Sequence, residues 1–458
     1  MKALRLLLAV PCLALGHLAA APVAPDLALP EKIFPQLQVI LDAAVQQSPR
    51  MINRALDLEI AENSRIAAQA GLLPSIYAGA SYYKSEDRNA FTYPNQPTIA
   101  NSYRVSKTPY SATLSQPLYH WGERRNAARI GEIQQKISQG QYREGYRLLA
   151  QELRGAYLRL IGQKLAVKRT RFYVEVTQEK LKQEEERLLQ KVISGAEIAI
   201  ARLTAEQAQL ALERAEFDFQ TAKASLARLS GQGVLADEAI PDSLPATGYA
   251  AEPYDRRLAG FLTQNDPPTT EAATLRSQLE VENLNYANAR TRLRPKASVT
   301  LGLSQDQQNN LYGTIDSYTL TSIYAGISVN WTLFDGFASG AAVRSSLARR
   351  RQLENDYRQL TARLAQDAQT QVKLINFSAR NMSIYDRFLS NGEGALQSVQ
   401  QEFKRGVKSE ADVSQAQLSL YDAQINAHNA RADYLLKTGD FLGTIMEDPV
   451  LANVAAIK

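Results

Sequence analysis

The chain has 458 residues, of which 45% are apolar and 22% charged, and its formal net charge is +5. This is the composition of a folded protein with enough length for two or three ordinary domains. Ala, Gln, Leu and Arg dominate from about residue 125 onward, which favours long helices. Basic and acidic residues alternate there, a pattern typical of solvated helix faces, so we expect no nucleic-acid partner.

The N-terminus predicts an exported protein. Lys2 and Arg5 precede an apolar run over 6–15, and small alanines follow at 19–21. This order is typical of a secretory signal, which we place at about residues 1–22.

Cys12 is the only cysteine of the chain. It suits an ordinary position of the signal better than a lipidation site, because the residues before it fit a lipidation motif poorly. The mature chain is then expected to hold no cysteine and to need no disulfide. No later run reaches about 18 apolar residues, so no transmembrane helix is predicted.

Two landmarks recur along the chain. Pro74 and Pro295 each end a helical stretch and each precede a segment in which apolar and polar residues alternate, at 76–82 and 297–303. A second alternating segment follows each of them, and a glycine turn follows that. The landmarks at these strand ends and turns are Pro74, Pro295, Pro117, Leu118, Tyr119, Leu333, Phe334, Asp335 and Gly336. We therefore predict two strand pairs, with polar loops at about 86–107 and 305–319.

A long helix is predicted after each strand pair. The first runs from about 126 to 192, with apolar residues in steps of three and four, and reverses at 192–196. The second reverses at 404–409, and the two halves align at an offset of about 215 residues. We interpret this as an internal duplication. The expected boundaries are 23–230 for the first repeat, 231–270 for a linker, 271–446 for the second repeat and 447–458 for an irregular tail.

Four strands of about ten residues are long enough to cross a bilayer at a tilt, but too few to close into a barrel. Open strand edges in lipid would leave backbone groups unpaired, so strands that enter a membrane predict an oligomeric ring. Helices of about 65 residues would be on the order of 100 Å long, which suits packing around a water-filled tube.

With this order of elements, the chain resembles the TolC-type outer-membrane efflux proteins over essentially the whole mature chain. The most specific marks are Gln-Pro-Leu-Tyr at 116–119, Trp-Thr-Leu-Phe-Asp-Gly at 331–336, and Gly406 followed by Asp412-Val413 and Leu-Tyr-Asp-Ala at 420–423. The resemblance implies an α+β membrane protein in which a long α-helical barrel continues into a small transmembrane β-barrel, with four strands from each chain.

The resemblance also implies a function and partners. It implies a homotrimer in outer-membrane lipid, with most of its mass in the periplasm, that works with a periplasmic adaptor and an inner-membrane pump. The expected role is the exit channel of a tripartite efflux or type I secretion system, without a cofactor.

Two sites are implied by position. Arg405, Gly406, Val407 and Lys408 match the hairpin tip where adaptors dock. Asp412, with Gln415 one turn later and Glu197 in the other half, matches a constriction at the periplasmic entrance. The alternatives are a plain hairpin turn at Gly406 and an ordinary carboxylate at a helix start for Asp412. In the first half Lys191 replaces the glycine, and Gly195 is expected to make the turn instead.

Enzymatic signals are absent from the sequence. The three histidines, His17, His120 and His428, stand apart from one another, and no metalloprotease, nucleophile-elbow or phosphate-loop motif occurs. The second functional hypothesis is a periplasmic coiled-coil adaptor or scaffold, although such proteins normally carry one hairpin between compact β-domains.

Overall fold

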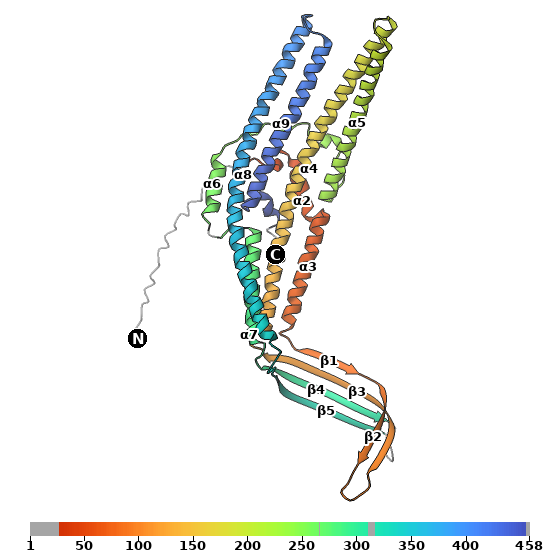
Figure 1. Cartoon of the computed structure of the whole chain (residues 1–458), viewed down its shortest axis with the longest axis vertical. Helices are drawn as coiled ribbons and strands as arrows, with labels where there is room; N and C mark the ends of the chain where they lie inside the picture. Colours follow the sequence, from red (N-terminus) through yellow and green to blue (C-terminus); the bar gives the residue numbers. More distant parts are fainter. Residues whose placement is uncertain (1–26, 265, 310–316, 455–458) are drawn as a thin grey trace, which may run out of the picture.

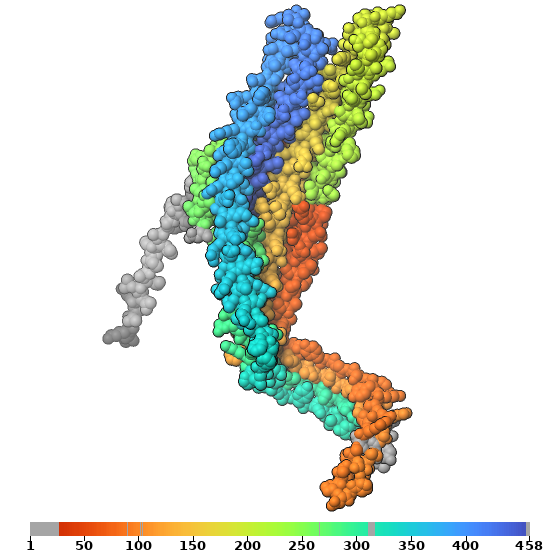
Figure 2. All heavy atoms as spheres, in the orientation of Figure 1, coloured from red at the N-terminus to blue at the C-terminus, as the bar shows by residue number. Residues whose placement is uncertain are grey.

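The computed structural model describes residues 27–264, 266–309 and 317–454. The predicted signal peptide and Cys12 lie outside these residues. The molecule is elongated: long helices lie side by side, and a sheet leaves their lower end at an angle (Figures 1 and 2).

The first half of the helical region contains five helices. Their bounds are α1 Pro30–Ile33, α2 Pro35–Gln47, α3 Pro49–Ala70, α4 Glu123–Leu189 and α5 Gly195–Ser230. The first three each begin with proline, whose fixed φ suits the first turn of a helix. The predicted stripe of α4 is confirmed, because Leu149, Leu153, Tyr157 and Leu160 are fully buried. With 67 residues, α4 is about 100 Å long.

The second half has the same order of long helices. Its elements are η1 Asp237–Ala239, α6 Glu252–Leu262, α7 Thr270–Thr291, α8 Ala338–Lys404, α9 Glu410–Thr444 and η2 Pro449–Val454. Two helical hairpins, α4–α5 and α8–α9, thus stand beside each other, while α3 and α7 flank the lower parts of α4 and α8 (Figure 1).

The sheet differs from the predicted four strands of about ten residues. It contains β1 Ser75–Ala80, β2 Tyr83–Phe91, β3 Ile99–Tyr119, β4 Lys296–Asn309 and β5 Ser317–Asn330. Its antiparallel order is β1-β3-β4-β5, and β2 continues from β1 along the same strand, β3. The loop prediction at 86–107 was wrong for 86–91 and 99–107, whose residues pair as β2 and β3, and was right for 92–98, which join these strands. The prediction at 305–319 was wrong for 305–309 and 317–319, which also pair. Cross-strand pairing overrode the turn-like composition in both places.

The register sorts the sheet into two chemically distinct faces. One face carries the rows Ile76–Leu114–Leu301–Ala325, Ala78–Ala112–Leu303–Ile323 and Tyr119–Ala297–Val329. The other carries Ser75–Ser115–Thr300–Gly326, Gly79–Ser111–Ser304–Ser322 and Pro117–Ser298–Ser328. Since side chains alternate between faces along a strand, one face is apolar and the other is rich in Ser, Thr and Gly. The polar face also carries the row Tyr77–Thr113–Gly302–Tyr324, which holds two tyrosines. The Tyr324 ring lies where a Cβ on Gly302 would be, so this row depends on glycine.

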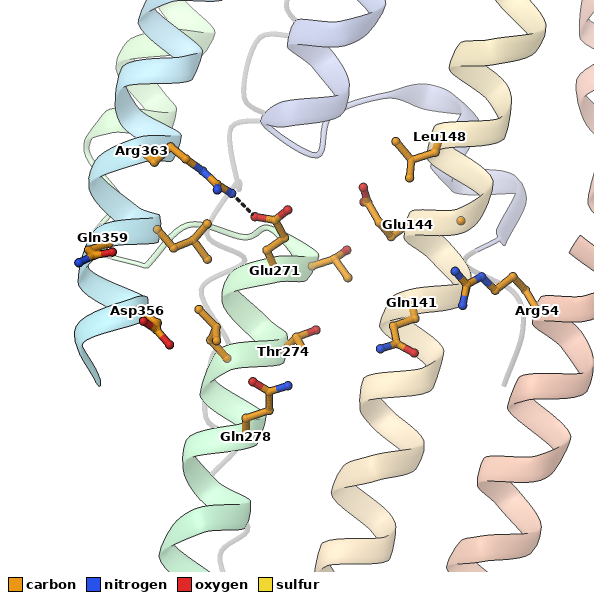
Figure 3. A pocket seen from close by; sticks show the side chains of 14 residues that line it. Arg54, Gln141, Glu144, Leu148, Glu271, Thr274, Gln278, Asp356, Gln359 and Arg363 are labelled. Atoms are coloured by element: carbon orange, nitrogen blue, oxygen red, sulfur yellow. Dashed lines mark hydrogen bonds and ion pairs between the residues drawn. The ribbon is translucent and has the colours of Figure 1, made fainter. Parts of the chain in front are cut away.

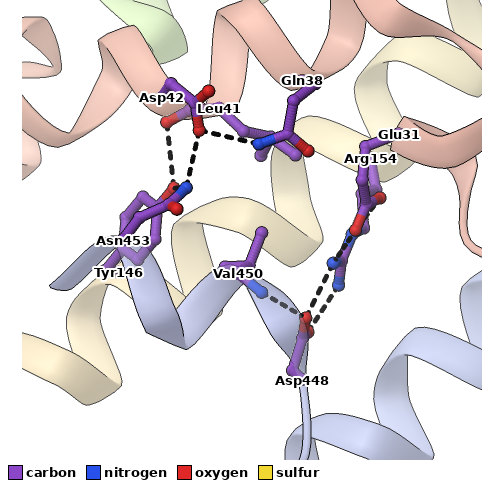
Figure 4. Close-up of polar contacts among 9 residues, drawn as sticks. All are labelled: Glu31, Gln38, Leu41, Asp42, Tyr146, Arg154, Asp448, Val450 and Asn453. Atoms are coloured by element: carbon purple, nitrogen blue, oxygen red, sulfur yellow. Dashed lines mark hydrogen bonds and ion pairs between the residues drawn. The ribbon is translucent and has the colours of Figure 1, made fainter. Parts of the chain in front are cut away.

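The main core lies halfway along the bundle, where both ends of the described chain meet α4. Tyr146 donates a hydrogen bond to the Leu41 carbonyl (2.9 Å), and burial raises the pKa of Tyr146 to about 12. Beside it, Arg154 binds Glu31 from α1 and Asp448 from the segment before η2 (Figure 4). The prediction of an irregular tail at 447–458 was therefore wrong for η2, whose Val450 and Val454 are buried against this core.

Left-handed backbone conformations recur at matching positions of the two halves. They occur at Trp121 and Gly122, then Lys191 and Gly231, and 215 residues later at Gly336, Phe337, Gly406 and Met446. Each set marks the start of a long helix, the tip of a hairpin and the end of the returning helix. At Gly231 a Cβ would lie 1.9 Å from the Gln47 carbonyl oxygen, so only glycine allows α5 to end against the junction of α2 and α3.

Candidate functional site

The second hairpin tip is built around Gly406. Helix α8 ends at Lys404, and Gly406 takes a left-handed φ of +77°. Its N–H donates to the Phe403 carbonyl (2.9 Å), and the Val407 N–H donates to the Glu402 carbonyl (2.9 Å), which closes the helix end. Arg405, Val407 and Lys408 are exposed around this turn.

The first hairpin tip has the same backbone without the glycine. Lys191 has a φ of +61° and its N–H donates to the Leu188 carbonyl, while the Val192 N–H donates to the Arg187 carbonyl. Gly195 is simply the first residue of α5. The expectation that Gly195 makes this turn was wrong, because hydrogen bonding at the helix end holds Lys191 in the left-handed region.

Asp412 and Glu197 occupy the third position of their helices and cap them. The Asp412 carboxylate accepts from the Ser409 backbone N–H (2.9 Å) and hydroxyl (2.8 Å), and Glu197 does the same with Ser194 (2.7 and 3.0 Å). The backbone hydrogen bond from each serine, followed by the hydroxyl bond, lowers the pKa of both carboxyls. These are reciprocal capping boxes, and the alternative of an ordinary helix-start carboxylate describes their local role.

The predicted entrance residues are not brought together within one chain. Asp412 and Gln415 are exposed on α9, whereas Glu197 lies at the separate tip of α4–α5 (Figure 1). A common constriction would therefore require contacts between chains.

The strand-end landmarks form the junction between sheet and helices. Pro74 precedes β1, Pro295 precedes β4, and Pro117 lies at a register shift in β3. The Trp121 indole N–H donates to the Pro295 carbonyl (2.7 Å), and the Trp331 indole N–H donates to the Leu293 carbonyl (2.9 Å). Each tryptophan, just after the end of a strand, is thus tied to the segment that precedes β4.

Asp335 and its neighbours begin α8. The Asp335 carboxylate accepts from the Ser339 N–H (2.9 Å), and Gly336 takes a left-handed φ of +64°. Leu333 and Phe334 are about 70% exposed, at 73% and 69%, as are Leu118 and Tyr119 to a lesser degree. Large apolar side chains therefore surround the end of the sheet that adjoins the helices, which we call the foot of the sheet.

A cavity of about 830 Å³ opens between α3 and α4 on one side and α7 and α8 on the other. Glu144 and Gln141 reach into it from α4, and Glu271 and Gln278 from α7 (Figure 3). Glu271 is held by Arg363 (2.8 Å). Outside the lining, Asp57 binds Arg54 and Arg147 binds Glu144. The lining contains no Cys, His, Ser or Lys side chain.

Within the described ranges, no group of three or more His, Cys, Asp or Glu side chains could hold a metal ion. Among the helices of the same residues, none is both long and apolar enough to cross a membrane.

Comparisons with known proteins identify the family. The family model described as "Outer membrane efflux protein" matches residues 40–232 and 271–438. "Outer membrane protein TolC" of Salmonella enteritidis is 22% identical over 445 residues, covering 91% of this chain and 83% of that protein.

Solved structures share the fold. The outer membrane protein VceC of Vibrio cholerae aligns with a TM-score of 0.63 at 16% identity, covering 91% of this chain and 97% of that one. The Campylobacter jejuni CmeC outer membrane channel aligns with a TM-score of 0.67 at 14% identity, covering 90% and 86%. The chain therefore belongs to the outer membrane efflux protein family and is an exit channel of the outer membrane, not an enzyme.

Proposed function

We propose that three copies of this chain form a closed conduit from an inner-membrane pump, through the periplasm and across the outer membrane. Each copy contributes four strand positions to a twelve-stranded barrel, because β1 and β2 share one position along β3. The apolar face points toward lipid and the Ser/Thr face toward the lumen. The single observation that carries the proposal is the sorting of the sheet into these two faces by its register.

The sheet edges support assembly. Among the described strands, β5 pairs only with β4, and β1 pairs only with β3. Each unpaired N–H or C=O in hydrocarbon costs several kcal/mol, so the β5 edge of one copy needs the β1 edge of the next. A rotation axis closes such head-to-tail contacts into a ring.

The arrangement of the two halves supports an origin by duplication, with repeats at 23–230 and 271–446 joined by the linker 231–270 and followed by 447–458. Matching left-handed residues, capping boxes and helix lengths recur at one offset. Six hairpins in a trimer would then surround the tunnel with approximate sixfold symmetry.

The hairpin tips are proposed as the periplasmic end of the conduit. Arg405, Gly406, Val407 and Lys408 would contact a periplasmic adaptor, while Asp412, Gln415 and Glu197 would line the entrance. One carboxylate from each α9, already engaged by Ser409, makes a weaker acidic ring than two would. The family assignment favours this channel over a periplasmic adaptor or scaffold.

Disulfide trapping tests the ring. A cysteine at Gly79 on β1 is combined in turn with cysteines from Ser322 to Ser328 on β5, in a background with Cys12 replaced. We expect cross-links between chains, and the cross-linked species should contain two or three chains but no more. A cysteine at Ser111, in the centre of the sheet, is the control and should not join chains. A purified protein that stays monomeric in detergent and in lipid would contradict the proposal.

A functional assay separates the two kinds of transport. Cells that lack the channel should regain export of small toxic compounds, or secretion of a polypeptide, when the chain is supplied. Whichever is restored identifies the pump class with which the channel works.

A further inference from the structure

A cavity of about 410 Å³ lies at the junction of sheet and helices in the first half of the chain. Its apolar side is formed by Leu72 after α3 and by Leu118 and Tyr119 at the end of β3. Its polar side is formed by Arg124 and Arg125 in the first turn of α4. The cavity therefore places two fixed positive charges beside an apolar surface.

The cavity opens at the foot of the apolar face. Tyr119 is paired with Ala297, which lies in register with Val329 on that face. Gln116, the preceding residue of β3 on the same face, donates a hydrogen bond from its amide to the Leu72 carbonyl (3.0 Å). This bond holds the segment after α3 against the strand. An acyl chain lying along the apolar face would thus reach Tyr119 and Leu72.

Among the described residues, no carboxylate neutralises the two arginines. Neither Arg124 nor Arg125 forms an ion pair with any residue that the structure describes, and both are exposed. The nearest carboxylate in sequence, Glu123, binds Lys296 instead. A third cation, Arg294, lies over the Trp121 ring at 4.5 Å from its centroid.

Positive side chains in the first turn of a helix face the positive end of its dipole. This placement weakens the helix start, so folding alone does not account for it. A bound anion would remove the conflict.

The second half of the chain provides an internal comparison. It repeats the exposed apolar foot with Leu333, Phe334 and Phe337. At the positions that correspond to Arg124 and Arg125 it has Ser339 and Gly340. The shared architecture therefore does not require arginines, and the cationic cavity is particular to the first half.

We propose that this cavity binds the head group of one anionic phospholipid of the periplasmic leaflet, with its phosphate held by Arg124 and Arg125 and an acyl chain along Leu72 and Tyr119. This inference rests on the proposed function, because it needs the strands to cross the outer membrane. The periplasmic end of a membrane strand lies at head-group depth, and basic pockets at that depth suit anionic lipids. Arginine also matches phosphate through paired N–H donors.

Native mass spectrometry of the channel in detergent, titrated with phosphatidylglycerol or phosphatidylcholine, tests the proposal. We expect one tightly retained phosphatidylglycerol for each chain, and at least tenfold weaker retention in the double variant Arg124→Gln/Arg125→Gln. Arg129→Gln, which removes an arginine one turn further along α4 that pairs with Glu280, is the matched control and should bind normally.

A transplanted site gives an independent result. Ser339→Arg/Gly340→Arg should add a second retained lipid for each chain, since a Cβ on Gly340 would meet no atom of another helix or strand within 4 Å. Inorganic phosphate as competitor distinguishes the sources of the anion: displacement at millimolar concentration would indicate a free-phosphate site and overturn the lipid assignment. Equal retention of phosphatidylcholine, or unchanged binding in the double variant, would also overturn it.

The inference and the proposed function fail in different ways. Loss of lipid from the double variant, with export and chain number intact, supports the site. A channel that exports normally without ever retaining anionic lipid refutes the site alone. A chain that neither assembles nor exports refutes the proposed function.

Discussion

Arg154 and Asp448 are joined by two hydrogen bonds of 2.6 and 2.8 Å although 294 residues separate them in the chain. The same guanidinium binds Glu31, so one side chain of α4 holds both ends of the described chain (Figure 4). Burial disfavours the charge, but hydrogen bonds and charge from Asp448 and Glu31 outweigh it and raise the pKa of Arg154. The arginine stays charged at every physiological pH.

Arg154→Ala should therefore destabilise the protein strongly. It leaves two buried carboxylates unpaired, a loss of about 3–5 kcal/mol. Thermal unfolding of the purified channel measures this. The surface pair of Arg171 and Glu216 is the control, since Arg171→Ala should cost at most about 1 kcal/mol. If Arg154→Ala lowers the free energy of unfolding no more than Arg171→Ala does, the contacts of Arg154 with Glu31 and Asp448 do not stabilise the ends of the described chain.

Adjacent strand residues should respond in opposite ways to the same charge. Leu301 lies on the apolar face and Thr300 on the polar face. Leu301→Arg should cost about 2–4 kcal/mol at mid-membrane depth and reduce the amount of channel in the outer membrane. Thr300→Arg should insert normally and lower cation conductance in planar bilayers. Equal insertion of both variants would contradict the assignment of the two faces.

The raised pKa of Asp440 on α9 predicts that the stability of the protein depends on pH. Burial raises the pKa of this carboxyl above its ordinary value of 3.8, against the pull of Arg147, Arg154 and Lys437. The folded state then holds this proton more tightly than the unfolded state, so stability falls as pH rises above 3.8 through the raised pKa.

Asp440→Asn should remove that dependence. It should raise the melting temperature most at neutral pH, where wild type carries the buried charge, and the gain should shrink as pH approaches 4. Thermal unfolding at several pH values checks this, with Asp422→Asn, an exposed carboxyl on the same helix, as the control. A gain that is constant with pH would show that the Asp440 charge is not the cause.

The two hairpin tips allow an exchange of residues. Lys191 and Gly406 have the same left-handed backbone, which costs a residue other than glycine about 1 kcal/mol. Lys191→Gly should slow hydrogen exchange of the first tip, and Gly406→Lys should accelerate it at the second. Exchange mass spectrometry of peptides from each tip measures both, with the untouched tip of each variant as its control. Faster exchange in Lys191→Gly would mean that the lysine side chain stabilises the turn.

The sequence predicts the helical part better than the sheet. Steps of three and four identify the buried stripe of α4, because residues at that spacing share one face of a helix, and Leu149 and Leu153 are both buried. The extent of β3 was missed because its polar end, from Ile99 onward, is held by pairing with β2. Pairing partners are a property of the fold and leave no local signal.

The buried triad shows the same limit at a single site. Arg154 sits in a helix full of arginines, and nothing nearby in sequence distinguishes it. Its partners Glu31 and Asp448 lie 123 and 294 residues away in the chain. By contrast, Ser409 and Asp412 stand three residues apart at a helix start, so the cap that they form joins close neighbours in sequence.

The entrance can be tested by adding the carboxylate that this chain lacks. Gln415 is exposed one turn after Asp412 on the same side of α9. Gln415→Asp would add three charges to the proposed ring, none of them engaged in a cap. Blocking of single-channel current by multivalent cations applied from the periplasmic side should then strengthen at least tenfold. Gln417→Asp adds the same charge on another side of the helix and should leave blocking unchanged. Equal effects of the two variants would place the constriction elsewhere, because only a side chain that faces the threefold axis feels its two copies at close range.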